Sequence, residues 1–304
     1  MNIQQFEYVL AVAKHRHFET AAESCFVAQS TLSTMLSKFE DEIGIQIFDR
    51  RRKPVEITYE GEQVIEQINK ILNEINQLDQ VVRSLKGEVA TSLRIGVIPT
   101  IAPYLLPLFL QSFSEQFPQV YFEIQELNTE GILKRIETRE LDIGILSTSV
   151  DIGEVNRMEL YQEDFVLFDA SAEDNSSIPF KDIDMSEFWM LEEGHCMRTQ
   201  ILEICEASKI KINPSLNLNY KAGSIDSLLR FVNANKGKTM LPAMAVPNLK
   251  ESDKVFVRPI IDEVPYRNIG VVIHEHYAKF HLLNVLKEVI LQSVKNQKGI
   301  RLID

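Results

Sequence analysis

The chain has 304 residues, of which 45% are hydrophobic and 25% are charged, as is common for globular proteins that dissolve in water. This length is sufficient for two or three domains. The amino terminus lacks a basic region followed by an apolar run, so we expect no signal peptide. The most apolar stretch, residues 101–110, is too short to span a bilayer, so we expect no membrane association.

Charge and cysteine content narrow the class further. The net charge of −12 argues against nucleic-acid binding by the chain as a whole, although a small binding module can lie within an acidic protein. Three cysteines without a secretory signal indicate the reducing cytoplasm, where a disulfide would be transient. We expect neither a metal ion nor a cofactor.

Residues 1–58 predict a helical unit that ends in a β-hairpin. Apolar side chains at helical spacing indicate three helices, near 2–15, 18–24 and 29–43. Gly44 ends the third helix, and two short strands follow, at 45–48 and 55–58. The strands flank a basic tip, as in a winged helix-turn-helix; the alternative is a plain helical subdomain with a solvated charged loop.

The third helix and the wing carry the side chains that we expect to contact double-stranded DNA. Amide and hydroxyl groups in the first turns of the helix suit the base edges of a major groove, and four consecutive cations in the wing suit phosphates. The predicted contact residues are Gln29, Ser30, Thr31, Ser33, Thr34, Lys38, Arg50, Arg51, Arg52 and Lys53.

Residues 59–88 predict one long helix that links this module to the rest of the chain. Apolar residues alternate spacings of four and three, beginning with Val64, Ile68 and Ile71, as in a coiled coil. A two-helix coil would pair two DNA-binding modules for contact with two half-sites. The alternative is an amphipathic helix packed on its own domain.

The remaining residues, 89–304, predict an α/β domain with two lobes, so that the whole chain combines α+β and α/β domains. Strands and helices alternate in βαβαβ order, at 92–98, 104–117, 120–126, 130–139 and 141–146. We assign lobe I to 89–162 and 268–304, and lobe II to 163–267. Two lobes joined by crossovers would place a ligand in the cleft between them, near strand ends.

Two of the three cysteines, Cys196 and Cys205, lie nine positions apart in a segment that suits a helix. A helix would hold their α-carbons ~13 Å apart on opposite faces, whereas a disulfide needs about 7 Å or less. The thiols can therefore bond only if the segment unwinds, which is the design of a two-state redox switch. Near the helix start, the dipole would favour a Cys196 thiolate. The alternative is that both are small buried hydrophobic residues.

Four motifs share their spacing with a known family. They are Phe18-x-x-Ala21-Ala22, Val27-x-Gln29-Ser30-Thr31-Leu32-Ser33, Phe39-Glu40-x-x-Ile43-Gly44-x-x-Ile47-Phe48-x-Arg50 and Thr58-x-x-Gly61. Together they resemble the amino-terminal module of LysR-type transcriptional regulators, which often have Pro at the position of Ser30 and Arg at that of Thr34. The resemblance implies a dimer formed through the linker helix and a regulatory domain like a periplasmic binding protein.

Three further segments carry a closer resemblance. They are Ile98-Pro99-Thr100 with Pro103 and Pro107, Gly194-His195-Cys196 with its spacing to Cys205, and Met240-Leu241-Pro242 with Pro247. They look like the hydrogen-peroxide-sensing members of the family, although Thr199 stands where those members commonly have aspartate. The resemblance implies that peroxide oxidises Cys196 to a sulfenic acid, which then bonds to Cys205. The implied peroxide-binding residues are Thr100, Thr129, His195, Cys196, Gln200 and Arg267.

The same resemblance implies the partners and the class. We expect a cytoplasmic activator of oxidative-stress genes, not an enzyme, that forms a homodimer and a homotetramer. RNA polymerase and a thiol reductant such as glutaredoxin or thioredoxin are the further expected partners.

Three alternatives remain. A LysR-type regulator that binds a small metabolite in the cleft would still respond after Cys196→Ser. A thiol peroxidase would turn over repeatedly with a reductant and would not need residues 1–58, and neither the wing nor the heptad helix serves that chemistry. A solute-binding protein would be expected to carry an export signal.

Overall fold

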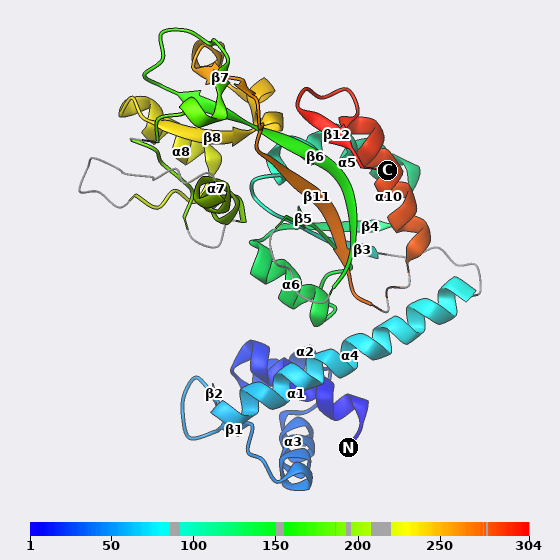
Figure 1. Ribbon diagram of the computed structural model, residues 1–304. Helices are drawn as coiled ribbons and strands as arrows, with labels where there is room; N and C mark the ends of the chain where they lie inside the picture. Colours follow the sequence, from blue (N-terminus) through cyan, green and yellow to red (C-terminus); the bar gives the residue numbers. More distant parts are fainter. Residues whose placement is uncertain are drawn as a thin grey trace. The chain divides into compact units, whose positions relative to one another are not determined.

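The computed structural model describes residues 1–85, 92–149, 155–185, 187–192, 196–207, 220–275, 277 and 279–303. Its contacts divide the chain into two units, Met1–Lys86 and Gly87–Asp304 (Figure 1). Among the described residues, no helix combines the length and the apolar character needed to cross a membrane.

The first unit contains the predicted helices and a hairpin, but the first strand begins at Phe48 and not at residue 45 as predicted, and both strands are shorter than expected. Its elements are α1 (Ile3–His15), α2 (Phe18–Ser24), α3 (Gln29–Ile43), β1 (Phe48–Asp49), β2 (Glu56–Ile57) and α4 (Tyr59–Leu85). Asn2 and Gln5 form a capping box at the start of α1, and Gly44 ends α3 at a φ of 70°, a value that glycine adopts without strain. Strands β1 and β2 pair antiparallel and form the wing.

The start of α4 is fixed by Thr58 and Gly61. The Thr58 hydroxyl donates to the carbonyl of Gln46 at 2.7 Å and accepts from the Gly61 N–H at 2.9 Å. A side chain at Gly61 would run into the carbonyl of Ile47, so only glycine fits. These contacts explain the spacing of the Thr58-x-x-Gly61 motif.

The two halves of helix α4 differ in how their apolar side chains are covered. In its first half Ile68 is buried and packs on the core of its own unit, together with Val64 and Ile71. Further along, Leu78 is 63% exposed and Val82 is 40% exposed. The second half of the helix therefore presents apolar side chains that a partner helix would cover.

The second unit contains one core around a mixed sheet and a second core beside it. The elements of the first core are β3 (Ser92–Val97), α5 (Ala102–Gln116), β4 (Tyr121–Glu126), α6 (Thr129–Glu137), β5 (Ile143–Ser147), β6 (Asn156–Asp169), β11 (Tyr266–Ile273), α10 (Phe280–Val294) and β12 (Ile300–Leu302). The strand order is β12-β6-β11-β5-β3-β4, in which β3, β4 and β5 are parallel. The predicted βαβαβ order is that of β3 to β5.

The second core gathers the segments between Phe165 and Ile260. Its elements are β7 (Ile178–Pro179), η1 (Phe180–Asp182), α7 (Cys196–Ala207), α8 (Ile225–Ala234), β8 (Lys238–Pro242), η2 (Ala243–Asn248), α9 (Glu251–Lys254), β9 (Val257–Arg258) and β10 (Ile260–Ile261). Strands β8 and β9 pair with the far end of β6.

Strand β6 belongs to both cores, which the sequence patterns did not predict. Its first part pairs with β11, and from Phe165 onward it pairs with β8 (Figure 1). Two lobes therefore share a single continuous strand, and Glu163 and Asp164 lie where it passes from one lobe to the other.

Candidate functional site

The carboxyl ends of three parallel strands bring predicted site residues to one edge of the sheet. Thr100 follows β3, Thr129 begins α6 after β4, and Ser147 ends β5. Because β3 pairs in parallel with both β4 and β5, these three ends lie at the same edge. Binding sites of α/β sheets form at this edge.

A buried ion pair reaches this edge from the shared strand. Arg267 on β11 and Glu163 on β6 are each 1% exposed, and the Arg267 Nη2 lies 2.8 Å from Glu163 Oε2. Arg267 also donates from Nη1 to the Thr100 hydroxyl at 3.0 Å and from Nη2 to the Thr100 carbonyl at 3.1 Å. The Thr100 hydroxyl therefore accepts from arginine and keeps its own proton free for another acceptor.

Cys196 lies in the field of this arginine. The thiol is free and 6% exposed, and Cys196 is the first residue of α7. Burial acts to lower the pKa of Arg267, but its electrostatic interactions with Glu163 and Cys196 and its hydrogen bond with Glu163 outweigh burial, so the pKa of Arg267 is raised. Tyr104 lies on α5, the helix that follows β3, and burial raises the pKa of its hydroxyl to about 12.

Gln200 joins α7 to the end of β5. Its Nε2 donates to the Ser147 hydroxyl, which donates in turn to the carbonyl of Asn268 at 3.0 Å. Among the described residues, Gln200 Oε1 and Thr129 Oγ1 are buried and have no hydrogen-bond partner. Buried polar atoms without partners are costly, so each favours a small polar ligand or a water beside it.

Helix α7 contacts both cores. Cys196 packs in the core around β3, whereas Met197 and Ile201 pack in the core around β8. Cys205 belongs to the same helix, which includes both cysteine positions without a break. The side chain of Cys205, and residue His195 altogether, lie outside the part of the chain that the structure describes.

The sequence patterns missed Glu163 and Ser147. Tyr161, Glu163, Phe165 and Leu167 are all buried, so Glu163 occupies an inward position in an alternating strand. An acidic residue at such a position needs a buried partner, and this signal was present in the sequence. No comparable signal marked Ser147, because its role depends on the approach of α7.

In the first unit, the predicted DNA contacts differ in exposure. Gln29, Ser30, Thr31, Thr34 and Lys38 on α3 are exposed, whereas Ser33 is half-buried. No side chain caps the start of α3, so the first backbone N–H groups of the helix are open to an anion such as a DNA phosphate.

The four wing cations do not share one environment. The side chains of Arg51 and Arg52 are 91% and 64% exposed, and Lys53 is also exposed. Arg50, by contrast, is half-buried, and it donates to Glu40 Oε2 at 2.6 Å and to the Ser33 hydroxyl at 3.3 Å. These bonds hold the wing against α3, so Arg50 has a structural partner before any DNA is bound.

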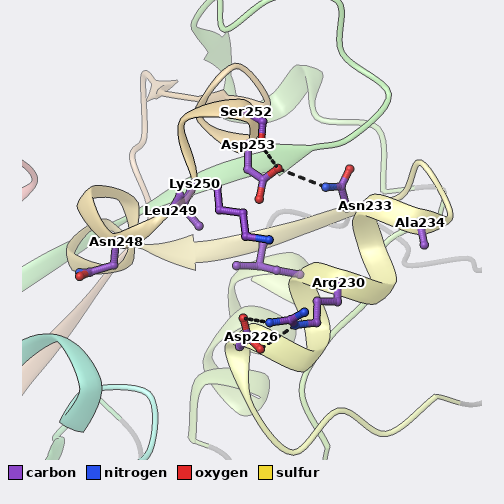
Figure 2. A pocket seen from close by; sticks show the side chains of 10 residues that line it. Asp226, Arg230, Asn233, Ala234, Asn248, Leu249, Lys250, Ser252 and Asp253 are labelled. Atoms are coloured by element: carbon purple, nitrogen blue, oxygen red, sulfur yellow. Dashed lines mark hydrogen bonds and ion pairs between the residues drawn. The ribbon is translucent and has the colours of Figure 1, made fainter.

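A pocket of about 620 Å³ opens on lobe II between α8 and the segment that follows β8. Figure 2 shows two polar pairs in its lining: Arg230 donates to Asp226 along α8, and Asn233 donates to Asp253 across the pocket. None of the predicted site residues lines it. In the described residues, no group of three His, Cys, Asp or Glu is placed to hold a metal.

Two family models match the chain. "Bacterial regulatory helix-turn-helix protein, lysR family" matches residues 3–62, and "LysR substrate binding domain" matches residues 86–295. The chain therefore belongs to the LysR family of bacterial DNA-binding transcriptional regulators.

Within that family the chain is similar to OxyR. It is 33% identical over 277 residues to the DNA-binding transcriptional dual regulator OxyR of Escherichia coli K12, covering 90% of this chain and 89% of that protein. It is 32% identical to the hydrogen peroxide-inducible genes activator of Haemophilus influenzae, covering 90% of each. A variant of full-length OxyR from Pseudomonas aeruginosa has a similar structure, with a TM-score of 0.72, 28% identity, and coverage of 96% of this chain and 98% of that one. The predicted winged helix-turn-helix, linker helix and two-lobed regulatory domain are confirmed.

Proposed function

We propose that the chain is a peroxide-sensing regulator in which hydrogen peroxide oxidises Cys196, and the resulting change alters the transcription of oxidative-stress genes. The observation that carries this proposal is the buried Cys196 thiol at the start of α7, which interacts electrostatically with Arg267, the residue that donates to the Thr100 hydroxyl. The similarity to peroxide-inducible activators supports the same conclusion.

In the first step the Cys196 thiolate attacks one oxygen of hydrogen peroxide. A sulfur–oxygen bond forms, the oxygen–oxygen bond breaks, and hydroxide leaves with the bonding electrons. Thr100 and Arg267 can donate hydrogen bonds to the departing oxygen, which a proton converts to water. Thr129 Oγ1 and Gln200 Oε1 are both buried without partners among the described residues. The threonine hydroxyl would donate to the bound peroxide or accept from it, and the amide oxygen would accept from it.

In the second step the thiol of Cys205 attacks the sulfur of the Cys196 sulfenic acid. A disulfide forms and water leaves, and a thiol reductant such as glutaredoxin or thioredoxin later returns two electrons. Because α7 includes both positions, the helix has to unwind before the bond can form. Unwinding withdraws Met197 and Ile201 from the core of lobe II, which converts a local oxidation into a change of the domain.

The remaining proposed partners follow from this role. In the cytoplasm a homodimer would bind double-stranded DNA through α3 and the wing, using the exposed apolar stripe of α4 as part of its interface. Two dimers would form a homotetramer that contacts RNA polymerase as an activator. Sedimentation of the full chain tests the assembly, and a clean dimer at micromolar concentration would contradict the tetramer.

The function itself is tested by counting thiols after a short pulse of near-stoichiometric hydrogen peroxide. Mass spectrometry is applied to wild type, Cys205→Ser and, as the matched control, Cys25→Ser, whose cysteine is half-buried in the other unit. We expect a Cys196–Cys205 bond in wild type and in the Cys25 variant, and sulfenic acid at Cys196 in the Cys205 variant. If Cys196 stays reduced at micromolar peroxide, the proposal fails, and a regulator that binds a metabolite becomes the better explanation.

A further inference from the structure

We propose that Glu163 is a positioning residue of the Cys196 site: its carboxylate orients the Arg267 guanidinium toward Thr100 and offsets part of its charge. This inference rests on the proposed peroxide chemistry at Cys196. It adds a residue on the strand shared by the two lobes to a site that otherwise comes from strand ends and α7.

The orientation follows from two hydrogen bonds and one ion-pair contact, which together use both carboxylate oxygens. Glu163 Oε2 accepts from Arg267 Nε at 2.9 Å and lies 2.8 Å from Nη2, so the guanidinium is held along one edge. Glu163 Oε1 accepts from the N–H of Met244 at 2.9 Å, which fixes the carboxylate itself. With Nε and Nη2 held by Glu163, Nη1 is directed to the Thr100 hydroxyl, to which it donates at 3.0 Å. A guanidinium held on two sides loses little freedom when it binds a ligand.

The charge argument follows from burial. Glu163 and Arg267 are 1% exposed, so little solvent screens either from Cys196. Among the residues that the structure describes, the other titratable groups facing this pair are Tyr161 on β6 and Tyr104 on α5. Both tyrosines have a pKa raised by burial, and they stay neutral at pH 7. The electrostatic influence on the Cys196 thiol is therefore that of the positive charge of Arg267, reduced by the negative charge of Glu163.

Two readouts separate these effects in the full-length chain. Alkylation of Cys196 by iodoacetamide, followed by mass spectrometry across pH, gives the pH at half-maximal reactivity and does not depend on peroxide. The rate constant for oxidation by hydrogen peroxide on the high-pH plateau reports the placement of the donors. The variants are Glu163→Gln, Glu163→Asp and the matched control Asp164→Asn, whose carboxylate is the next on β6 and pairs with Arg301 at 2.7 Å.

We expect Glu163→Gln to shift the alkylation midpoint down by roughly one pH unit, because the uncancelled arginine favours the thiolate. We expect its peroxide plateau to fall by roughly tenfold or more, since an amide cannot accept from both Arg267 and Met244. Glu163→Asp keeps the charge, so its midpoint should stay in place while its plateau falls. Asp164→Asn should match wild type in both readouts.

A lower plateau with an unmoved midpoint in Glu163→Gln is what a merely structural residue would give, and it overturns the proposal. If that variant does not fold, Glu163→Gln combined with Arg267→Gln is compared with Arg267→Gln alone. If the alkylation midpoint of Arg267→Gln is higher than that of the double variant, the difference measures the influence of the Glu163 carboxylate. Equal midpoints in these two variants overturn the proposal. Failure of the wild-type chain to react with micromolar peroxide would instead reject the proposed function, while the alkylation result still decides the role of Glu163.

Discussion

Each of the two units contains a glutamate–arginine ion pair with similar further contacts, one near the surface and one in the interior. In the first unit Glu40 accepts the backbone N–H groups of Ile47 and Phe48 and binds Arg50, which lies over a phenylalanine ring and reaches a serine hydroxyl. In the second unit Glu163 accepts one backbone N–H and binds Arg267, which also lies over a phenylalanine ring and reaches a threonine hydroxyl.

Exposure separates the two pairs. The side chains of Arg50 and Glu40 are 31% and 9% exposed, whereas those of Arg267 and Glu163 are both 1% exposed. Water can replace a missing partner at the first pair but not at the second. One geometry can therefore serve two purposes: near the surface it anchors a wing, and in the interior it keeps an arginine charge within electrostatic reach of Cys196.

The largest expected effect comes from breaking the deeper pair. Arg267→Met leaves the Glu163 carboxylate buried without a cation, and we expect a loss of about 3–5 kcal/mol in the free energy of unfolding. Urea unfolding followed by the fluorescence of Trp189, the single tryptophan of the chain and 5% exposed, reports on this unit. The double variant Glu163→Leu with Arg267→Met removes both charges and should recover much of the loss. If Arg267→Met lowered the free energy of unfolding by less than about 1 kcal/mol, the burial of this pair would not determine its importance for stability.

A third pair tests whether depth alone decides the size of the effect. Asp142 lies 2.9 Å from Lys279, whose side chain is 4% exposed, and also accepts from the backbone N–H of Arg94 at 2.8 Å. We expect Asp142→Asn to lower the free energy of unfolding by about 2–3 kcal/mol at pH 7, less than at Arg267, because an amide keeps one acceptor.

The pH dependence of this third pair has a definite sign. Burial would raise the pKa of Asp142, but Lys279 and Arg94 outweigh it and hold the pKa below its ordinary value of 3.8. A lowered pKa means that the ion pair stabilises the fold above pH 3.8 and that this contribution is lost as the pH falls through the lowered value. The gap between wild type and Asp142→Asn in urea unfolding should therefore narrow below pH 3.8. A constant gap down to pH 3 would place the stabilisation elsewhere.

Much of the fold could be predicted because its signals are local. Helical spacing, Gly44 and the Thr58-x-x-Gly61 motif each act within a few residues, and all of them are reflected in the first unit. The shared strand could not be predicted, because a run of 14 residues says nothing of which partner lies beside each half. Pairing with β11 and then β8 depends on segments that lie 69 to 117 residues further along the chain, as from Asp169 to Lys238 and from Asn156 to Ile273.

The same distinction applies to the site. Thr100, Arg267 and Cys196 could be proposed from motifs, and the structure brings all three into one field. Ser147 could not, since its hydroxyl becomes relevant only when α7 places Gln200 against it. Nor could the wing motif distinguish Arg50 from Arg51, because the partner of Arg50 lies on another element.

The shallower pair predicts a smaller effect in the first unit. Glu40→Gln removes the charge that holds Arg50 but keeps one acceptor for the backbone, so we expect a loss of about 1–2 kcal/mol. Thermal unfolding followed by circular dichroism gives the change. The matched control is Glu42→Gln, whose carboxylate is 50% exposed and pairs with the amino terminus, where we expect less than about 0.5 kcal/mol. Equal losses in the two variants would mean that Glu40 does not anchor the wing.

The smallest effect on stability is expected at the exposed wing cations, where the consequence appears in DNA binding. Arg51→Gln with Arg52→Gln should leave the unfolding free energy indistinguishable from that of wild type, since both side chains are exposed and their ion pairs are solvated. Each arginine that no longer neutralises a phosphate should reduce the slope of log affinity against log salt by about 1, for all DNA sequences alike. Arg50→Gln should differ, because it releases the wing from Glu40 and so lowers both stability and affinity. A double variant with an unchanged salt slope would remove Arg51 and Arg52 from the DNA interface, and would leave the anchored Arg50 as the only wing arginine proposed to bind DNA.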